Sequence, residues 1–260
     1  MKLDAHEVAF SYGRGNQVLK SVTAAVVPGS FLAILGVNGC GKSTFLDCLD
    51  GMLSPRRGCV KLDDVDLKDI GRRARAQSIA YVAQHSHANR LIAYDALLLG
   101  RKPFIEASPT EEDFAIVDEV ISDMELGDLA FRYVDELSGG EYQKIVIGRA
   151  LVQCQDVLLL DEPTNNLDIA NQIEVMALIR KAVNARSIAA AAVMHDINLA
   201  LAYCDRFLAL KRGEPIAYGG AEVVTEELLQ TVYGIDADII EWNGKRVVVP
   251  YEHREKRKKS

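Results

Sequence analysis

The 260-residue sequence lacks any run close to the roughly 18 to 20 consecutive apolar residues that a helix needs to cross a bilayer. Its opening residues, MKLDAHEVAF, also lack the apolar core of a secretory signal. We therefore expect the chain to remain in the cytosol. A basic excess is missing as well, because the net charge is −7, whereas proteins that bind nucleic acid broadly carry positive charge against the phosphates. No nucleic-acid partner is expected.

Paired cysteines are also missing. The sequence has no CxxC pair, and its five cysteines lie in apolar or glycine-rich segments, at Cys40, Cys48, Cys59, Cys154 and Cys204. Unpaired cysteines are typical of a reducing compartment, and we interpret four of them as small core residues. Cys40 differs because it lies inside a glycine-rich loop, where oxidation could block access to a ligand. An inert thiol is the alternative interpretation.

Local patterns predict an α/β fold. Apolar and polar residues roughly alternate at 3–10 and 18–27, which favours half-buried strands of an antiparallel sheet. Short apolar runs favour further strands, at 31–35, 60–62, 79–82, 157–160 and 188–193. Helical spacing separates them, at 42–49, 72–75, 141–152, 169–183 and 225–233. Buried strands that alternate with helices indicate a parallel sheet covered on both faces.

The pattern of apolar residues changes between about 91 and 136. No convincing strand occurs there, and the apolar residues of 95–99 and 114–124 have helical spacing. We therefore predict one domain over 1–260. In it, a helical subdomain at 86–137 is inserted into an α/β core formed by 1–85 and 138–235. Residues 236–260 are expected to form C-terminal strands and a basic tail. The tail is interpreted as a solvated end, with contact to an anionic membrane surface as the alternative.

A phosphate-binding loop is predicted where GVNGCGKS, residues 36–43, fits the pattern G-x-x-x-x-G-K-[ST] between a strand and a helix. Glycines let successive backbone N–H groups turn toward an anion, and the lysine adds a positive charge. The start of the following helix points its positive end at the same place. The residues predicted to contact the phosphates are Gly36, Val37, Asn38, Gly39, Cys40, Gly41, Lys42, Ser43 and Thr44. A simple glycine-rich turn is the alternative.

Two carboxylates, Asp161 and Glu162, follow the apolar strand at 157–160, at the edge where an α/β sheet places its ligands. Asp161 is expected to hold Mg²⁺, usually through water, together with Ser43. Glu162 is then free to accept a proton from an attacking water. The alternative is an acid that caps the next helix.

A hydroxyl and two glycines occur in LSGGE, residues 137–141, where a helix is expected to begin. Such a helix start offers unpaired N–H groups to an anion. Ser138 could equally be an ordinary N-cap.

Together these motifs resemble those of the ATP-binding subunit of an ABC transporter. They occur in the order typical of that family and cover nearly all of the chain: Tyr12, the phosphate loop, Gln84, LSGGE at 137–141, LLLDEP at 158–163, Asn166 to Asp168, and His195. The resemblance implies the P-loop NTPase fold of ABC ATPases, with ATP and Mg²⁺ as ligands and ATP hydrolysis as the activity.

The resemblance also implies roles for single residues. Tyr12 stacks on adenine, Gln84 contacts Mg²⁺ and couples it to the helical subdomain and a membrane partner, and His195 holds the γ-phosphate and attacking water. Catalysis is assigned to Lys42, Gln84, Glu162 and His195. From the residues alone, an ordinary strand aromatic, a surface amide and a satisfied histidine remain alternatives for Tyr12, Gln84 and His195.

A second copy of the chain is implied as a partner. In the family, Ser138, Gly139, Gly140 and Glu141 of one subunit face the ATP held by the other, and Asp168 communicates across the interface. Glu141 and Gly148 stand where many relatives have Gln and Ala. A glycine inside a helix costs about 1 kcal/mol relative to alanine.

Local cues resemble the importers of ferric siderophores, haem or cobalamin: LGRKP at 99–103, LAFR at 129–132, MHDINLA at 194–200 and VYG at 232–234. This implies transmembrane permease subunits, indirectly an extracytoplasmic substrate-binding protein, and a place on the cytoplasmic face of the membrane. The alternatives are a soluble ABC ATPase that is not coupled to transport and a nucleotide-gated regulatory subunit. The resemblance also implies that the cargo does not contact the ATPase.

Overall fold

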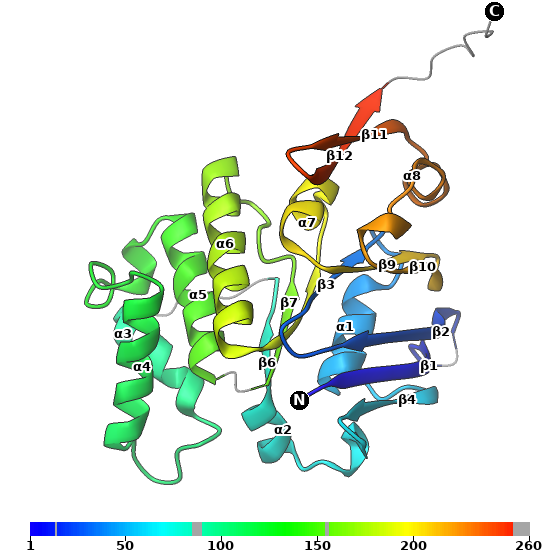
Figure 1. The fold of residues 1–260 in the computed structure, drawn as a ribbon. Coiled ribbons are helices and arrows are strands. Elements are labelled where there is room, and N and C mark those ends of the chain that lie inside the picture. Colours follow the sequence, from blue (N-terminus) through cyan, green and yellow to red (C-terminus); the bar gives the residue numbers. More distant parts are fainter. Residues whose placement is uncertain (14, 85–89, 154–155, 252–260) are drawn as a thin grey trace, which may run out of the picture.

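A six-stranded sheet forms the centre of the computed structural model (Figure 1), which describes residues 1–13, 15–84, 90–153 and 156–251. The strand order is β10-β9-β3-β8-β7-β6, and all neighbours are parallel except β9 and β10. The strands are β3 (Phe31–Leu35), β6 (Ile79–Val82), β7 (Val157–Asp161), β8 (Ala189–Val193), β9 (Arg206–Lys211) and β10 (Glu214–Gly219). The predicted α/β class is confirmed.

Both faces of this sheet are buried, which explains the continuous apolar runs. In β3, Phe31, Ala33 and Leu35 belong to one core cluster, whereas Leu32 and Ile34 belong to another on the opposite face. Successive side chains of a strand point to opposite faces, so a strand covered on both sides needs apolar residues at every position. All residues of β3, β7 and β8 are buried.

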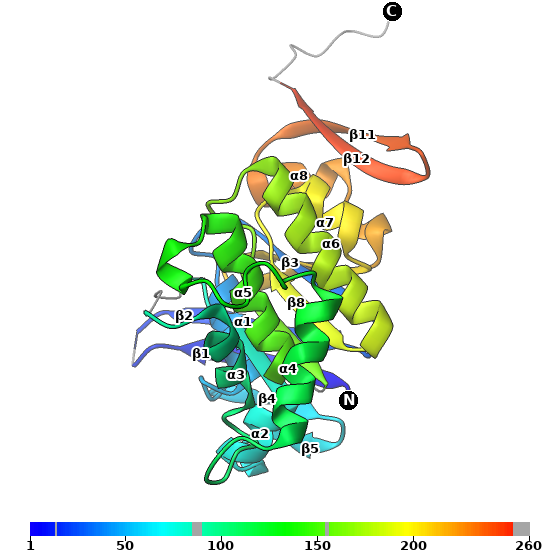
Figure 2. The ribbon, with the colours of Figure 1, turned by 90° about the vertical axis from the view of Figure 1, so that its left-hand side faces the viewer.

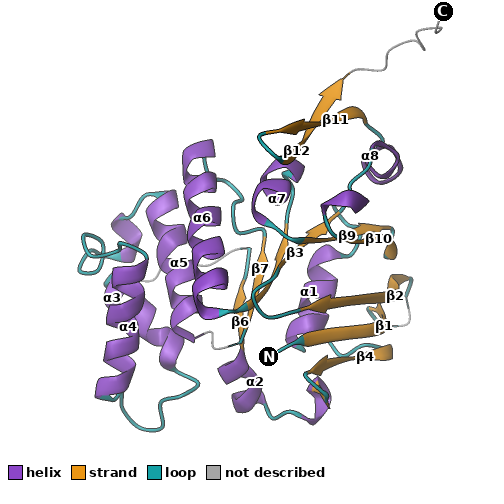
Figure 3. Ribbon diagram, in the orientation of Figure 1, coloured by secondary structure: helices purple, strands orange, loops and turns teal. Residues whose placement is uncertain are grey.

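One face of the sheet is covered by helices and the other mainly by α1 and a second sheet (Figure 3). The first group consists of α3 (Ala93–Leu98), α4 (Glu111–Asp123), α5 (Gly139–Gln153), α6 (Ile169–Arg186) and α7 (Ile197–Tyr203). On the other face lie α1 (Lys42–Asp50) and the antiparallel sheet, whose order is β2-β1-β4-β5. Its strands are β1 (Leu3–Ser11), β2 (Gln17–Val26), β4 (Arg57–Leu62) and β5 (Val65–Asp66).

The region predicted as a helical subdomain contains α3, α4 and two 3₁₀ turns, Leu99–Arg101 and Val134–Glu136. A buried ion pair joins these parts, because Arg101 Nε lies 2.9 Å from Asp113 Oδ1. Asp113 also accepts hydrogen bonds from Thr110 in a capping box at the start of α4. The predicted boundary at 85–86 meets residues 85–89, which lie outside the described residues.

Gly148 sits where α5 packs closely against the helical region. A Cβ atom at this position would lie 2.7 Å from Leu97 Cδ2 and 3.3 Å from Leu126 Cδ1. Because real Cβ atoms do not approach other atoms so closely, the glycine permits this packing. An alanine at this position would require the Leu97 side chain to shift.

The C-terminal part consists of α8 (Glu226–Tyr233) and a hairpin of β11 (Asp236–Trp242) and β12 (Lys245–Tyr251). In a view turned by 90°, the hairpin lies at one end of the molecule, away from α3 and α4 (Figure 2). The basic tail from His253 onward lies outside the described residues. Within the described part of the chain, no helix is long and apolar enough to span a membrane.

The cysteine predictions have different outcomes. Cys48 and Cys204 are buried core residues, as predicted. The prediction is wrong for Cys59, which is partly exposed within β4. Cys154 lies outside the described residues. Cys40 is buried within the phosphate loop, with 4% of its surface exposed, and burial raises the pKa of its thiol.

Asp50, the last residue of α1, has a partly buried carboxyl group. We expect its titration to change the free energy of unfolding with pH. Burial raises its pKa to about 6, although the charge of Arg75 opposes the shift. In the unfolded chain the pKa is about 3.9. Between these two values the folded state binds a proton that the unfolded state does not. Stability from this group is therefore present below pH 4 and is lost as the pH rises through about 6.

We expect Asp50→Asn to raise the melting temperature at pH 8, because it removes a charge that burial disfavours. The gain should be about 1 to 2 kcal/mol, which corresponds to a few degrees for a chain of this size. It should shrink toward zero as the pH falls to 4. Thermal unfolding followed by circular dichroism at both pH values measures it, with the exposed Asp64→Asn as control. A gain that is equal at pH 4 and pH 8 would contradict the assignment.

Candidate functional site

Four parallel strands end at one edge of the central sheet, and a predicted site residue follows each of them. β3 leads into Gly36, β6 into Gln84, β7 into Glu162 and β8 into His195. The strands are neighbours in the order β3-β8-β7-β6. Because the carboxyl ends of parallel strands meet at the same edge, these residues come together although they are far apart in the sequence.

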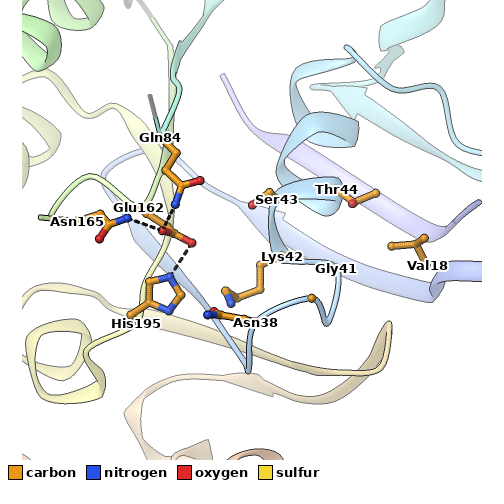
Figure 4. A pocket seen from close by; sticks show the side chains of 11 residues that line it. Val18, Asn38, Gly41, Lys42, Ser43, Thr44, Gln84, Glu162, Asn165 and His195 are labelled. Carbon is orange, nitrogen blue, oxygen red and sulfur yellow. Dashed lines mark hydrogen bonds and ion pairs between the residues drawn. The ribbon is translucent and has the colours of Figure 1, made fainter. Parts of the chain in front are cut away.

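A cavity of about 580 Å³ lies at this edge and is lined by the last three of these residues, but not by Gly36; it is shown in Figure 4. The lining residues are Val18, Asn38, Gly39, Gly41, Lys42, Ser43, Thr44, Gln84, Glu162, Asn165 and His195. Val18 and Asn165 are not predicted from the sequence. Asn165 had one available signal, since it is an amide three residues after Glu162 in the same strand-end loop. Val18 had none, because it is an ordinary β2 residue.

The phosphate loop has the backbone that its glycines suggest. Gly36, Gly39 and Gly41 have φ values of 148°, 75° and 110°, which residues with a side chain rarely adopt. At Gly36 a Cβ atom would also lie 2.4 Å from the carbonyl oxygen of Leu210. The loop then enters α1 at Lys42, so the unpaired N–H groups of the helix start face the cavity.

Lys42 is held against the loop rather than extended into solvent. Its Nζ donates hydrogen bonds to the carbonyl oxygens of Gly36, at 2.9 Å, and Val37, at 3.2 Å. Only 5% of its surface is exposed. Both of these partners are neutral, so the positive charge remains available to a bound anion. Figure 4 shows the side chain directed toward the cavity.

Ser43 and Asp161 form a pair of oxygen donors beside Lys42. Ser43 Oγ donates to Asp161 Oδ1 at 3.1 Å, and Asp161 is 7% exposed. Burial raises the pKa of Asp161, and the hydrogen bond from Ser43 opposes this shift. A hydroxyl and a carboxylate at this distance are the hard oxygen ligands that Mg²⁺ prefers, and the cation would relieve the cost of the buried charge. The residues present therefore fit a magnesium ion.

Glu162 is fixed from three sides. Its Oε2 accepts hydrogen bonds from Gln84 Nε2, at 2.5 Å, and Asn165 Nδ2, at 3.1 Å, while Oε1 lies 2.6 Å from His195 Nε2. The backbone of Glu162 has a φ of 52°, which is unfavourable for a residue with a side chain and is often found at functional sites. The carboxylate is thus aimed into the cavity next to His195 (Figure 4).

Tyr12 lies next to α1 but does not line the cavity. Its ring packs edge to face on Phe10 at 4.9 Å, and its hydroxyl is 3.4 Å from Thr44 Oγ1. With 57% of its surface exposed, the ring offers a free face beside the phosphate loop. A planar base can stack on such a face.

LSGGE lies outside the cavity and forms a capped helix start. The Ser138 N–H donates to Glu141 Oε2 at 2.8 Å, and the Glu141 N–H donates to Ser138 Oγ at 3.4 Å. The hydrogen bond from the Ser138 N–H is the main reason why the pKa of Glu141 is lowered. This is the capping-box geometry. The N-cap interpretation of Ser138 is therefore observed within one chain.

Asp168 lies beside LSGGE rather than beside the phosphate loop. It caps α6 by accepting hydrogen bonds from the backbone N–H and the side-chain amide of Asn171, both at 2.8 Å, which lower its pKa. A Cβ atom on Gly140 would lie 2.1 Å from Asn171 Oδ1, so the starts of α5 and α6 touch. The predicted site residues thus form two groups: those in or beside the cavity, here called the cavity group, and a second group made of residues 138–141 and Asp168.

Comparison with protein families and sequences gives consistent matches. Residues 19–165 match the ABC transporter family. The chain is 46% identical over 250 residues to an uncharacterized ABC transporter ATP-binding protein of Methanocaldococcus jannaschii, covering 96% of this chain and 98% of the relative. It is 34% identical over 249 residues to a hemin import ATP-binding protein of Bordetella avium, covering 92% and 95%.

Solved structures resemble the whole fold. A metal-chelate type ABC transporter in an inward-facing conformation matches with a TM-score of 0.83 and 28% identity, covering 96% of this chain and 97% of that one. A bacterial ABC transporter cassette described as dimeric matches with a TM-score of 0.72 and 28% identity, covering 84% and 98%.

Proposed function

This chain belongs to the ABC transporter family of ATP-binding proteins and is an ATPase, and from that premise we propose that it powers an importer of ferric siderophores, haem or cobalamin as a homodimer that encloses two ATP molecules. Its fold is the predicted P-loop ATPase fold of that family, with an antiparallel β-sheet and a helical region beside the core.

The main support for a dimer that encloses ATP between two chains is the separation of the two site groups. The cavity group can bind a triphosphate, yet LSGGE and Asp168 do not line that cavity. A reaction that uses both groups at one ATP needs a second chain in which LSGGE faces the phosphate loop of the first. With two identical chains related by a two-fold axis, the same contact forms twice. The similarity to a dimeric cassette supports this arrangement.

In each cavity we assign phosphate binding to the loop 36–44 and to Lys42, and adenine stacking to Tyr12. Ser43, Asp161 and Gln84 would hold Mg²⁺. Gln84 donates its amide N–H to Glu162, which leaves its amide oxygen free for a cation. When bound, the ion neutralises charge on the phosphate oxygens.

Glu162 and His195 are assigned to the attacking water. Their contact at 2.6 Å shows that both side chains reach the same point of the cavity. Glu162 can accept the proton of a water placed there, and His195 can hold that water and the γ-phosphate. Placement is the main contribution, because phosphoryl transfer depends on the alignment of the nucleophile and on stabilisation of the oxygen charges.

The permease is proposed to dock on the helical region near Gln84. Three large apolar side chains of the helical region are exposed: Phe131 is 79% exposed, Leu99 48% and Tyr133 43%. The rings of Phe131 and Tyr94 stack at 6.3 Å, which makes a flat aromatic surface suited to a protein partner. Docking on a permease would place the chain at the membrane, on its cytoplasmic face, as a peripheral subunit. An extracytoplasmic binding protein would then act only through the permease.

We expect the chain to co-purify with its permease, and the complex to hydrolyse ATP faster when a loaded binding protein delivers one of three cargoes: a ferric siderophore, haem or a corrinoid. Phe131→Asp should reduce recovery of the permease about 10-fold, because truncating or charging an aromatic anchor at an interface costs that much or more. Ile216→Asp serves as control, since Ile216 is exposed on β10 at the opposite edge of the sheet from β6. Failure to recover any membrane protein with the wild-type chain would favour the soluble ATPase.

A further inference from the structure

Tyr233, the last residue of α8, reaches the phosphate loop from the far end of the sequence. Its hydroxyl accepts a hydrogen bond from the N–H of Gly36 at 3.0 Å. Gly36 is the first residue after β3, so this bond is made where the strand turns into the loop. Burial raises the pKa of Tyr233 to about 12, so the hydroxyl keeps its proton at neutral pH.

The position of Tyr233 is set by the packing of α8. Thr225 caps the start of the helix and Gly234, with a φ of 71°, ends it. Leu228, Leu229 and Val232 are buried. Lys211 at the end of β9 also donates a hydrogen bond to the carbonyl oxygen of Thr231, at 2.5 Å. The helix is thus tied to the strand beside β3, and Tyr233 has little freedom to leave Gly36.

The hairpin that follows α8 is hydrogen-bonded to α7, the helix that follows His195. Asn198 on α7 donates from Nδ2 to the carbonyl oxygen of Val248 at 3.0 Å and accepts from the Val248 N–H at 2.7 Å. This two-bond contact joins β12 to the helix that begins two residues after His195. Lys245 adds a bond to the carbonyl oxygen of Ala202, at the end of α7.

We propose that residues 225–251, here called the C-terminal clamp, set the position of the phosphate loop relative to His195, with Tyr233 and Asn198 as positioning residues. The clamp is one packed unit, because α8 and β11 are joined by two residues and contact each other. One segment is therefore hydrogen-bonded both to the start of the phosphate loop and to α7, the helix that follows His195. The inference rests on the proposed function, since it requires the loop to hold ATP.

Removing the Tyr233 hydroxyl leaves the Gly36 N–H without its acceptor, in a place where a side chain would strike the backbone of Leu210. An unpaired buried donor is unfavourable and moves to find a new partner. The loop start would shift with it. Small displacements of phosphate-binding groups lower affinity and rate strongly, because their alignment determines both.

Tyr233→Phe should weaken the binding of ATP and of ADP about 5- to 10-fold, the range expected for a lost buried hydrogen bond. Fluorescent-nucleotide titration without turnover measures it. The control is Tyr218→Phe, because the Tyr218 hydroxyl likewise accepts from a backbone N–H, that of Ala25, but on the β10 and β2 side; it also donates to the Ala25 carbonyl oxygen, both at 3.0 Å. Tyr218→Phe should lower the melting temperature at least as much as Tyr233→Phe does. Equal nucleotide affinities in both would overturn the proposal.

Variants of Asn198 test the second contact of the clamp, which joins α7 to β12. Asn198→Ala should lower kcat about 10-fold with little change in nucleotide affinity, because it releases α7 behind His195. Asn198→Asp keeps the acceptor for the Val248 N–H and should fall between wild type and Asn198→Ala. The loss from Asn198→Ala should be smaller in a Tyr233→Phe background, since both act on one unit. Strictly multiplicative losses would overturn the single clamp. If Tyr233→Phe does not fold, the Asn198 series decides alone, and equal kcat values reject the proposal.

Lys42→Ala separates this inference from the proposed function. If Lys42→Ala binds ATP as tightly as the wild type, the nucleotide site itself is wrongly assigned. If Lys42→Ala loses binding while Tyr233→Phe behaves as Tyr218→Phe does, only the C-terminal clamp is rejected.

Discussion

Replacing Glu162 by Gln is expected to lower ATP turnover about 100- to 10,000-fold, the range for loss of a positioned general base. Glutamine has the same size, and its amide oxygen can keep the hydrogen bonds from Gln84 and Asn165, but the amide cannot accept the proton of the attacking water. ATP affinity should stay within about 3-fold, because the phosphate loop and Lys42 are untouched. The effect is specific to a carboxylate held in place by a φ of 52° and by Gln84, Asn165 and His195.

The same variant should accumulate as a dimer when ATP is present, because nucleotide that is bound but not hydrolysed keeps the two chains together. Steady-state phosphate release and size-exclusion chromatography with ATP measure the two effects. Glu112→Gln, an exposed change on α4, is the matched control and should behave as wild type. An ATPase rate near wild type in Glu162→Gln would refute the assigned base.

Ser138→Asp should abolish turnover while the isolated chain still binds nucleotide. Aspartate caps a helix as well as serine does, so α5 should remain intact. Its charge, however, would face the γ-phosphate held by the second subunit, and two like charges at such a distance repel strongly where water is excluded. We expect a loss of more than about 100-fold in turnover and less than about 2-fold in monomer affinity, since Ser138 does not line the cavity of its own chain.

Ser138→Thr is the matched variant, because it keeps both the cap and the hydroxyl and should retain most of the activity. Both rates come from the same phosphate-release assay, and the affinities from fluorescent-nucleotide titration. Wild-type turnover in Ser138→Asp would mean that LSGGE is only a helix start.

Much of the fold is predictable from the sequence because its signals are local. β3 is predicted with the bounds observed, since a five-residue apolar run can only be buried on both faces. α4 begins three residues before its predicted start, because its first turn is polar and depends on the capping box of Thr110 and Asp113. α7 is not predicted, because INLALAY is mostly apolar and carries no clear helical stripe.

The sequence predicts which residues are candidates for the site, but it does not predict which of them lie together in space. The motifs predict residues for phosphate binding, metal binding and proton transfer, but only the sheet order brings Gln84, Glu162 and His195 to one point. From the residues alone, Ser138 remained either a ligand or a cap, and its capping bonds are present. The Tyr233 contact joins residues 197 positions apart, for which no spacing rule exists.

The shared site can be tested most directly by cross-linking two differently tagged chains that carry Glu162→Gln. One chain receives Asn38→Cys in the exposed part of the phosphate loop, and the other receives Ser138→Cys. With ATP, oxidation should produce a covalent dimer that contains both tags, because in the proposed dimer each LSGGE faces its partner's loop. The Ser138→Cys chain alone sets the background from Cys40. If no dimer with both tags forms above that background with ATP, the two chains do not complete each other's site.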